Sequence, residues 1–316
     1  MRAVVWMMAA AGILWGAGWN AAGQATRAAI PVAIIDGASG GAYHNWRLTT
    51  PVLKRELEET GLFSVTVLTA PPPGGDFSSF HPELHRYRAV VMNYDGPSWP
   101  AELRAEFERF VAGGGGLVIV HAADNAFPDW PAYNEMTGIG GWRNRDEKAG
   151  PYWYYEDGKL RSDDAPGPAG RHGARLPFAI TARAPEHPIL KGLPAVWLHA
   201  NDELYGMLRG PGKNMTVLAT AHSDPNNKGT GHDEPMLMVL RYGKGRIFHT
   251  TLGHDVFAMS CVGFITTLQR GTEWVATGRV TQKTPTDFPT AKIVSYRADI
   301  AEMAPEFLNG ASPVAK

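Results

Sequence analysis

Three histidines and two carboxylates have the types and the placement that acid/base chemistry needs. His44, His121 and His254 each lie in a segment that follows an apolar run, and "ANDELYG" adds Asp202 and Glu203. A neutral imidazole can accept or donate a proton near neutral pH, and a carboxylate can orient the ring or act as its partner. These five residues are therefore our candidates for catalysis, by proton transfer at a hydroxyl group or beside a carbonyl.

The same histidines can instead bind a metal. Three nitrogen or oxygen ligands and one open position form the usual arrangement of a catalytic zinc ion. His44, His121 and His254 are far apart in the sequence, and no H-x-x-x-H or H-E-x-x-H spacing links them. Two alternatives stay open: a divalent metal such as zinc on these three residues, or histidine chemistry without a metal.

Each histidine also has a structural interpretation. His121 and His254 can bond a backbone carbonyl at a strand end. His187 precedes a proline in "EHPIL" and is expected to shape a turn, whereas His199 and His249 lie in strand-like runs as core residues. In an extended segment, neighbouring side chains point to opposite faces, so at most one of the two adjacent carboxylates is expected to face the site.

"GASGG" matches the G-x-S-x-G pattern that marks a serine nucleophile. A hydrolase elbow leads directly from the serine into a helix, but Ser39 is followed by "GGAYH" before a plausible helix start at Asn45. We therefore predict a flexible glycine loop through which backbone N–H groups approach a polar ligand. A plain connection between strand and helix is the structural alternative.

Alternating strands and helices position these residues. Expected strands cover residues 31–36, 62–70, 88–94 and 117–122, and expected helices cover 49–61 and 100–113. This order predicts a parallel sheet with helices on both faces. Because ligands collect at the carboxyl ends of parallel strands, the loops 37–44, 121–127 and 253–257 should form one site. These strand ends supply our candidates for substrate binding: Asp36, Gly37, Asn45, Asp124 and Asn125.

The second half of the chain is less regular. Residues 138–176 are rich in Gly, charges and aromatic residues without a clear period, and we expect a long excursion of loops and short strands. Because aromatic faces can stack on ring-shaped ligands, Trp142 and Trp153 from this segment join the substrate-binding candidates. Strand-like runs and an apolar helix at 264–278 follow, and a polar tail is expected over residues 281–316.

Composition and the N-terminus limit the function classes. With 30 basic and 31 acidic residues the chain offers no basic field for nucleic acid, and a single cysteine, Cys261, excludes an intramolecular disulfide. Arg2 precedes a long apolar run that ends in small residues near Ala25, which predicts a signal peptide over residues 1–25. We expect a secreted or periplasmic protein; an uncleaved segment would instead anchor it to a membrane.

The chain resembles the ThuA-like (trehalose utilisation) family in four successive blocks: "IDGASGGAYHNWRLTTPVLKRELEETGLFSV", "GGGGLVIVHAADNAFPDW", "EHPILKGLPAVWLHANDELYG" and "GKGRIFHTTLGHD". The resemblance implies a flavodoxin-like α/β domain, similar to class I glutamine amidotransferases, over residues 26–280. It also implies sugar, disaccharide or keto-sugar metabolism. Where an amidotransferase has its catalytic cysteine this chain has His121, so glutaminase activity is not implied.

Two function classes therefore remain. The first is an exported enzyme that acts on a small carbohydrate through histidine-based acid/base chemistry. The second is a non-catalytic carbohydrate-binding protein on the same scaffold, because a fold alone does not decide function. Several imidazoles and a carboxylate at one rim favour the enzyme, since a binding protein has no need for them.

Overall fold

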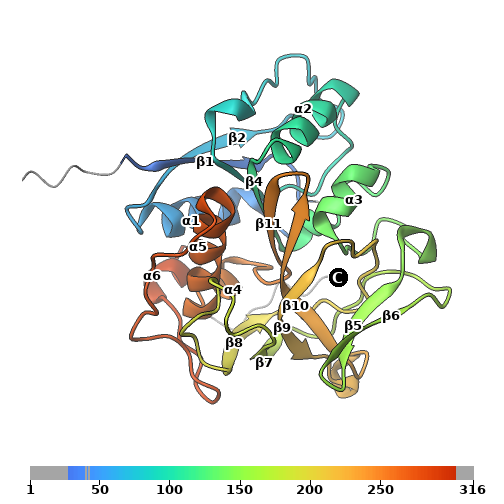
Figure 1. Cartoon of the computed structure of the whole chain (residues 1–316), viewed down its shortest axis with the longest axis vertical. Helices are drawn as coiled ribbons and strands as arrows, with labels where there is room; N and C mark the ends of the chain where they lie inside the picture. Colours follow the sequence, from blue (N-terminus) through green and yellow to red (C-terminus); the bar gives the residue numbers. More distant parts are fainter. Residues whose placement is uncertain (1–27, 40, 42, 304–316) are drawn as a thin grey trace, which may run out of the picture.

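The computed structural model describes residues 28–39, 41 and 43–303. Within them one eleven-stranded sheet runs through the molecule in the order β2-β1-β3-β4-β11-β10-β9-β7-β8, and β5 and β6 extend from β10 (Figure 1). The strands are β1 (Ile30–Asp36), β2 (Phe63–Thr69), β3 (Ala89–Met92), β4 (Gly116–Val120), β5 (Tyr152–Glu156), β6 (Lys159–Asp163), β7 (Leu176–Ala182), β8 (Val196–Asp202), β9 (Thr216–His222), β10 (Asp233–Tyr242) and β11 (Gly245–Thr250).

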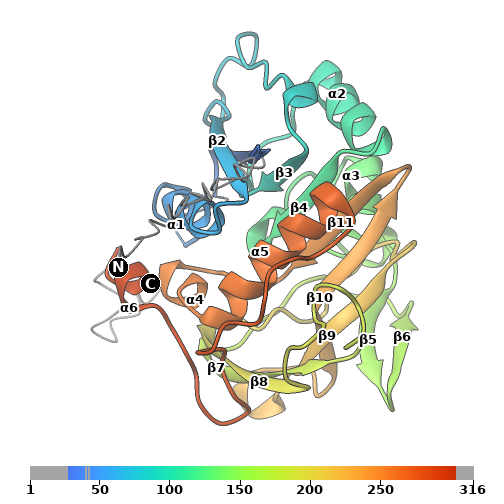
Figure 2. The same cartoon turned by 60° about the vertical axis from the view of Figure 1, so that its left-hand side comes forward.

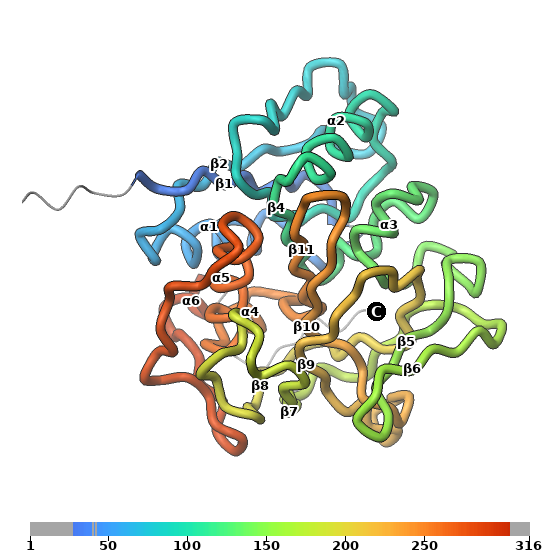
Figure 3. Tube along the Cα trace, viewed as in Figure 1, coloured from blue at the N-terminus to red at the C-terminus, as the bar shows by residue number. Residues whose placement is uncertain are grey.

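The sheet has two halves, one with parallel strands and one with antiparallel strands. Strands β2, β1, β3, β4 and β11 are parallel to one another, as the alternation of strands and helices predicts. From β11 onward, β10, β9, β7 and β8 continue the same sheet in antiparallel order. Strand β11 lies beside β4 although more than a hundred residues separate them in the chain (Figure 3). The α/β architecture is confirmed, with an antiparallel extension added to its parallel core.

Two apolar cores cover the two faces of the parallel half. Val32 and Ile34 of β1 pack into one core, and the alternate residues Ala33 and Ile35 pack into the other, as expected for a strand buried on both sides. Helices α1 and α5 cover the first face, and α2 and α3 cover the second (Figure 2). The α-helices are α1 (Trp46–Glu58), α2 (Ala101–Ala112), α3 (Pro131–Thr137), α4 (Val256–Met259), α5 (Val262–Thr277) and α6 (Ala298–Ala301).

Two segments without a clear sequence period are ordered by the rest of the fold. The excursion over residues 138–176 contains the β5–β6 hairpin, which pairs with β10. The segment 281–303, expected as a tail, packs along the domain. The backbone N–H of Leu198 donates to the carbonyl of Thr290, and the backbones of Cys261 and Tyr296 form an isolated antiparallel β-bridge. Among the described residues no helix is long and apolar enough to cross a membrane. The expected signal peptide lies outside the described residues.

Candidate metal and substrate site

Four side chains converge at one edge of the sheet. One donor atom each from His44, His121, Glu203 and His254 lies within 4.8 Å of the other three. Glu203 Oε2 is 3.0 Å from Nδ1 of His254, 3.8 Å from Nε2 of His121 and 3.9 Å from Nε2 of His44. We call these four residues the His/Glu cluster.

The two halves of the sheet both contribute to the His/Glu cluster. His121 directly follows β4, His254 follows β11, and His44 stands in the loop between β1 and α1. The three imidazoles meet because parallel strands end at the same edge, as the sequence predicts. Glu203 directly follows β8, at the far end of the antiparallel half. The cluster therefore joins segments from both halves.

One buried imidazole nitrogen of the cluster, Nε2 of His121, has no hydrogen-bond partner among the described residues. Nδ1 of His121 lies 2.6 Å from the carbonyl of Thr251, so this nitrogen carries the proton and donates it there. In the neutral ring Nε2 then carries the lone pair and faces the cluster, where no described residue donates to it. Nδ1 of His254 lies 3.0 Å from Oε2 of Glu203. Because an unmatched buried acceptor is costly, this arrangement fits a bound cation better than an empty cluster. The bond to Thr251 is the backbone-carbonyl contact that the structural interpretation of His121 expects, and it leaves Nε2 of the same ring directed at the cluster.

The protonation states of Glu203 and His254 favour the binding of a cation. Burial acts to raise the pKa of Glu203, but His121, His254 and His44 outweigh it and hold that pKa well below its usual range. Burial lowers the pKa of His254 to about 4, which leaves this ring neutral near pH 7. An ionised carboxylate beside a neutral imidazole is the protonation state in which both can act as metal ligands.

Asp202 lies behind the cluster, which corrects its place among the catalytic candidates. Its side chain is fully buried, 2.9 Å from Nε2 of His199, and it accepts the backbone N–H groups of Glu203, Gly253 and His254. Asp202 and Glu203 point in different directions because they are neighbours at the end of an extended strand. Asp202 therefore positions the cluster and does not reach its centre.

A pocket of about 490 Å³ opens beside the cluster. His44 and Glu203 line it, and Trp142, Tyr205 and His172 form an aromatic wall; the ring centroids of Trp142 and Tyr205 are 4.5 Å apart. The Tyr205 hydroxyl is 3.3 Å from Nε2 of His44, so this wall is in contact with the cluster.

An unusual turn carries part of this wall. Trp142, Arg143 and Asn144 all have left-handed backbone conformations, with φ of 50°, 51° and 60°. Such residues cost of order 1 kcal/mol or more each, and surrounding contacts must hold them in place. Arg145 does so: its buried guanidinium donates to the carbonyls of Asn125, Gly141 and Ala126 and to Oδ1 of Asn134.

The expected substrate-binding residues fall into two groups. Asn125 and Trp142 line the pocket beside the cluster, while Gly37 and Asn45 line a second pocket that adjoins it. The other three expected residues, Asp36, Asp124 and Trp153, line neither pocket. Asp36 and Asp124 are buried. Asp124 Oδ2 lies 3.3 Å from Nε2 of the core residue His249. Trp153 Nε1 donates to the carbonyl of Gly210, away from the site, because its strand β5 belongs to the outer hairpin.

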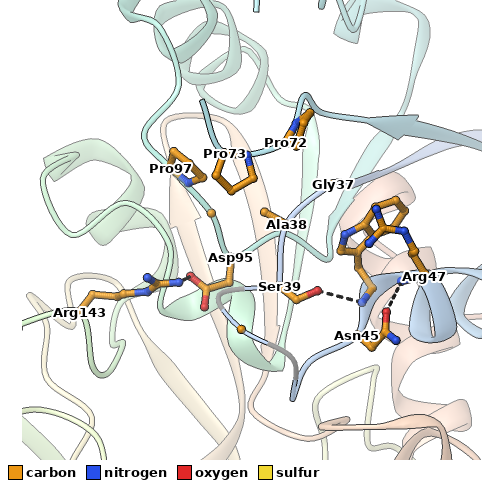
Figure 4. Close-up of a pocket in the computed structure, with 13 residues that line it drawn as sticks. Gly37, Ala38, Ser39, Asn45, Arg47, Pro72, Pro73, Asp95, Pro97 and Arg143 are labelled. Atoms are coloured by element: carbon orange, nitrogen blue, oxygen red, sulfur yellow. Dashed lines mark hydrogen bonds and ion pairs between the residues drawn. The ribbon is translucent and has the colours of Figure 1, made fainter. Parts of the chain in front are cut away.

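Ser39 has a structural role at the first helix. Its Oγ accepts the backbone N–H of Trp46 at 2.9 Å (Figure 4), and among the described residues no acid/base side chain hydrogen-bonds to it. Gly37 before it has φ of 124°, and a Cβ there would lie 2.3 Å from the carbonyl oxygen of Ala70. The glycine loop is therefore a tight connection whose serine satisfies the helix end.

Five residues that line the pocket are not among the candidates predicted from the sequence: Tyr43, Asp95, Arg143, His172 and Tyr205. Tyr205 stands two positions after Glu203, so the same extended spacing that separates Glu203 from Asp202 would have placed it on the cluster side. Asp95 follows the end of β3, a parallel strand whose carboxyl end lies at the same edge of the sheet as those of β1, β4 and β11. His172 and Arg143 come from the irregular excursion, where no spacing rule identifies them.

Comparisons with other proteins agree with this architecture. A family model described as ThuA, trehalose utilisation, matches residues 32–275. The chain is similar to a putative ThuA-like protein of Parabacteroides merdae, with 46% identity, 86% of this chain and 99% of that chain covered, and a TM-score of 0.83. It shares its fold with a second such protein, from Bacteroides uniformis, at 20% identity, 81% and 94% coverage and a TM-score of 0.54. No curated protein matches the chain.

Proposed function

The chain belongs to the ThuA family, and from this premise we propose that it is a metal-dependent enzyme of carbohydrate metabolism with its active site at the His/Glu cluster. The family description, trehalose utilisation, supports a sugar, disaccharide or keto-sugar as substrate. The observation that carries the metal is the convergence of three imidazoles on the ionised Glu203, with the buried Nε2 of His121 left without a partner among the described residues.

The ligand set narrows the choice of metal. Three imidazoles and one carboxylate suit zinc and also iron, nickel or manganese, whereas Ca²⁺ and Mg²⁺ prefer oxygen ligands throughout. Metal–nitrogen bonds of about 2.0–2.1 Å require the most widely separated donor atoms, which lie up to 4.8 Å apart, to move closer together when a metal binds. One carboxylate neutralises one of the two positive charges, so the loaded site keeps a net charge that attracts oxygen ligands.

Acid/base chemistry on the sugar follows from the residues around the cluster. When bound, a divalent metal would polarise a carbonyl or hydroxyl oxygen. The partly exposed Trp142 offers an aromatic face against which the apolar side of a sugar ring packs, and the buried ring of Tyr205 packs against Trp142. His172, 3.7 Å from Oε1 of Glu203 and with 37% of its side chain exposed, is placed to carry a proton between substrate and solvent. Cys261 is buried away from the pocket, so no thiol nucleophile takes part.

The enzyme proposal is tested by metal removal and a substrate panel. The purified protein is treated with a chelator, assayed on trehalose, glucosides and their 3-keto forms, and reloaded with zinc, manganese or nickel, with metal content measured by elemental analysis. We expect one metal per chain and turnover that is lost with the metal and restored by it. Turnover that ignores chelation would leave histidine as the only proton carrier. Tight sugar binding without conversion would instead identify a carbohydrate-binding protein.

We also propose that the protein is exported. Arg2, the apolar run after it and the small residues before Thr26 support a cleaved signal peptide. Expressed with its native start in a Gram-negative host, the protein should be recovered from the periplasm with an N-terminus near Thr26. Full-length protein in the cytoplasmic fraction would contradict export.

A further inference from the structure

A buried ion pair between His199 and Asp202 lies behind the His/Glu cluster. Nε2 of His199 is 2.9 Å from Oδ2 of Asp202, and neither side chain is exposed to solvent. Residues three apart in a regular strand point to opposite faces, so this contact needs an irregularity in β8. Leu176 of β7 pairs with the aspartate and Phe178 with the histidine, so β8 has one residue more than β7 over this stretch. Such a β-bulge changes the direction in which side chains point.

Asp202 connects the backbones of two cluster residues. Its Oδ1 accepts the N–H of Glu203 at 2.8 Å and that of His254 at 3.1 Å. Its Oδ2 accepts the N–H of Gly253 at 2.7 Å and also faces Nε2 of His199. Glu203 follows β8 and His254 follows β11, and three other strands lie between these two in the described sheet. Because β8 and β11 do not pair with each other, the carboxylate of Asp202 sets the spacing between the segments that follow them.

The distances within the His/Glu cluster agree with this role of Asp202. Oε2 of Glu203 is 3.0 Å from Nδ1 of His254, but 3.8 Å and 3.9 Å from the nitrogens of the other two histidines. Glu203 therefore lies closest to the one histidine of the cluster whose backbone is bound by the same carboxylate as its own.

Opposite charges stabilise the His199–Asp202 pair. Burial acts to lower the pKa of His199, but Cys261 and Asp202 outweigh it and raise that pKa to about 10. Burial acts to raise the pKa of Asp202, but His199 and the backbone N–H groups outweigh it and lower that pKa. Removal of one partner from a buried ion pair leaves an uncompensated charge, which is costly. Loss of the His199 ring therefore favours a rearrangement of the segments that Asp202 holds.

We propose that His199 and Asp202 are positioning residues of the metal site. They hold Glu203 and His254 in the arrangement that a metal binds, although neither is itself a ligand. The inference rests on the proposed function and adds to it the residues that determine the affinity and the coordination geometry of the site.

The test removes the ion pair and measures metal binding. His199→Ala removes the imidazole, His199→Gln keeps an N–H donor near the position of Nε2, and Asp202→Asn keeps the shape of the side chain without its charge. His249→Ala is the matched control, because His249 forms an equally buried pair with Asp124. Among the described residues, the Asp124 side chain accepts no backbone N–H of the cluster.

Three measurements are made on each variant. Competition with a chromogenic chelator gives the zinc affinity, and the visible absorption spectrum of the cobalt-loaded protein reports the coordination geometry. Thermal melting without metal verifies that the variant is folded and shows how much stability it has lost. The melting temperature separates a general loss of stability from a change at the metal site.

We expect His199→Ala and Asp202→Asn to weaken zinc binding about 10–100-fold, as is usual when a residue that orients a metal ligand is removed, and to change the cobalt spectrum. His199→Gln should recover most of the affinity. His249→Ala should bind both metals as the wild type does, even if its melting temperature falls.

The opposite results would separate the two proposals. If a folded His199→Ala or Asp202→Asn protein keeps the wild-type affinity and spectrum, or if His249→Ala loses as much affinity, the positioning role is refuted while the proposed function stands. If His199→Ala does not fold, Asp202→Asn decides by the same two readouts. If the wild type binds neither zinc nor cobalt, the proposed function fails as well.

Discussion

At the scale of single residues, His121 is the most direct test of the active site. His121→Ala removes one cluster nitrogen, and loss of a general acid/base typically lowers turnover by roughly 10²–10⁴-fold. We expect a loss of that order together with reduced metal content in a protein that remains folded, with a melting temperature lowered by the loss of the buried hydrogen bond to Thr251. His187→Ala, a partly buried histidine outside the site, is the matched control. An unfolded His121→Ala protein would assign this histidine a structural role instead.

Ser39 allows the opposite test. Because its hydroxyl satisfies a helix N–H, Ser39→Ala should cost about 1 kcal/mol of stability, the usual contribution of such a cap, and leave most activity intact. Chemical denaturation and turnover assays measure the two effects. A serine-directed phosphonate should not label the wild type, and stoichiometric labelling at Ser39 would overturn this assignment.

At the scale of elements, Glu234 links the excursion to the sheet. It lies in β10, is fully buried, and accepts the hydroxyl of Tyr152 at 2.5 Å and that of Thr230 at 2.6 Å. Burial raises its pKa to about 7. The hairpin that carries Tyr152 is therefore attached to the sheet through a carboxyl group that is partly protonated near neutral pH.

This carboxyl group should make stability depend on pH. Because the pKa is higher in the folded than in the unfolded chain, Glu234 contributes its full stability below about pH 4.5 and loses it as the pH rises towards 7. The loss amounts to roughly 3 kcal/mol. Denaturation of Glu234→Gln at several pH values should lack this decline, whereas the exposed-site control Glu186→Gln should retain it. A decline of equal size in Glu234→Gln would show that another group is responsible.

The elements also show why the sequence predicts one part of the site and not the rest. Strand ends are visible in the sequence as apolar runs, so the meeting of His44, His121 and His254 follows from a parallel sheet alone. Which of Asp202 and Glu203 faces the cluster depends on the register of β8, and alternation allows either choice. Trp153 lies outside the pocket because β5 pairs with β10, a long-range pairing that no local pattern encodes.

At the scale of the whole molecule, the cluster joins the two halves of the sheet. Three ligands come from the parallel half, and Glu203 follows the edge strand β8 of the antiparallel half. A metal that binds only the folded state at a hundred times its Kd stabilises that state by about 2.7 kcal/mol. Addition of the cognate metal should therefore raise the melting temperature of the wild type by several degrees. Glu203→Gln should respond much less, and an equal response would place the metal elsewhere.

The fold as a whole was predictable in class and only partly in arrangement. Alternating strands and helices up to residue 122 correctly indicate a parallel sheet with helices on both faces. The runs after residue 176 have apolar content typical of strands, but their composition does not indicate that β10 pairs antiparallel with β11 and extends the sheet. That choice depends on the tight turn at Gly243, which has φ of 56°, and on tertiary packing.

The left-handed run from Trp142 to Asn144 has a consequence for binding kinetics. Its shape is held by Arg145 within the protein, so the wall is already formed before any ligand arrives. A preorganised surface does not lose conformational entropy at the moment of encounter. Association should therefore be limited by diffusion and orientation, not by a slow loop rearrangement, and differences in affinity among related sugars should arise mainly from how fast each one leaves.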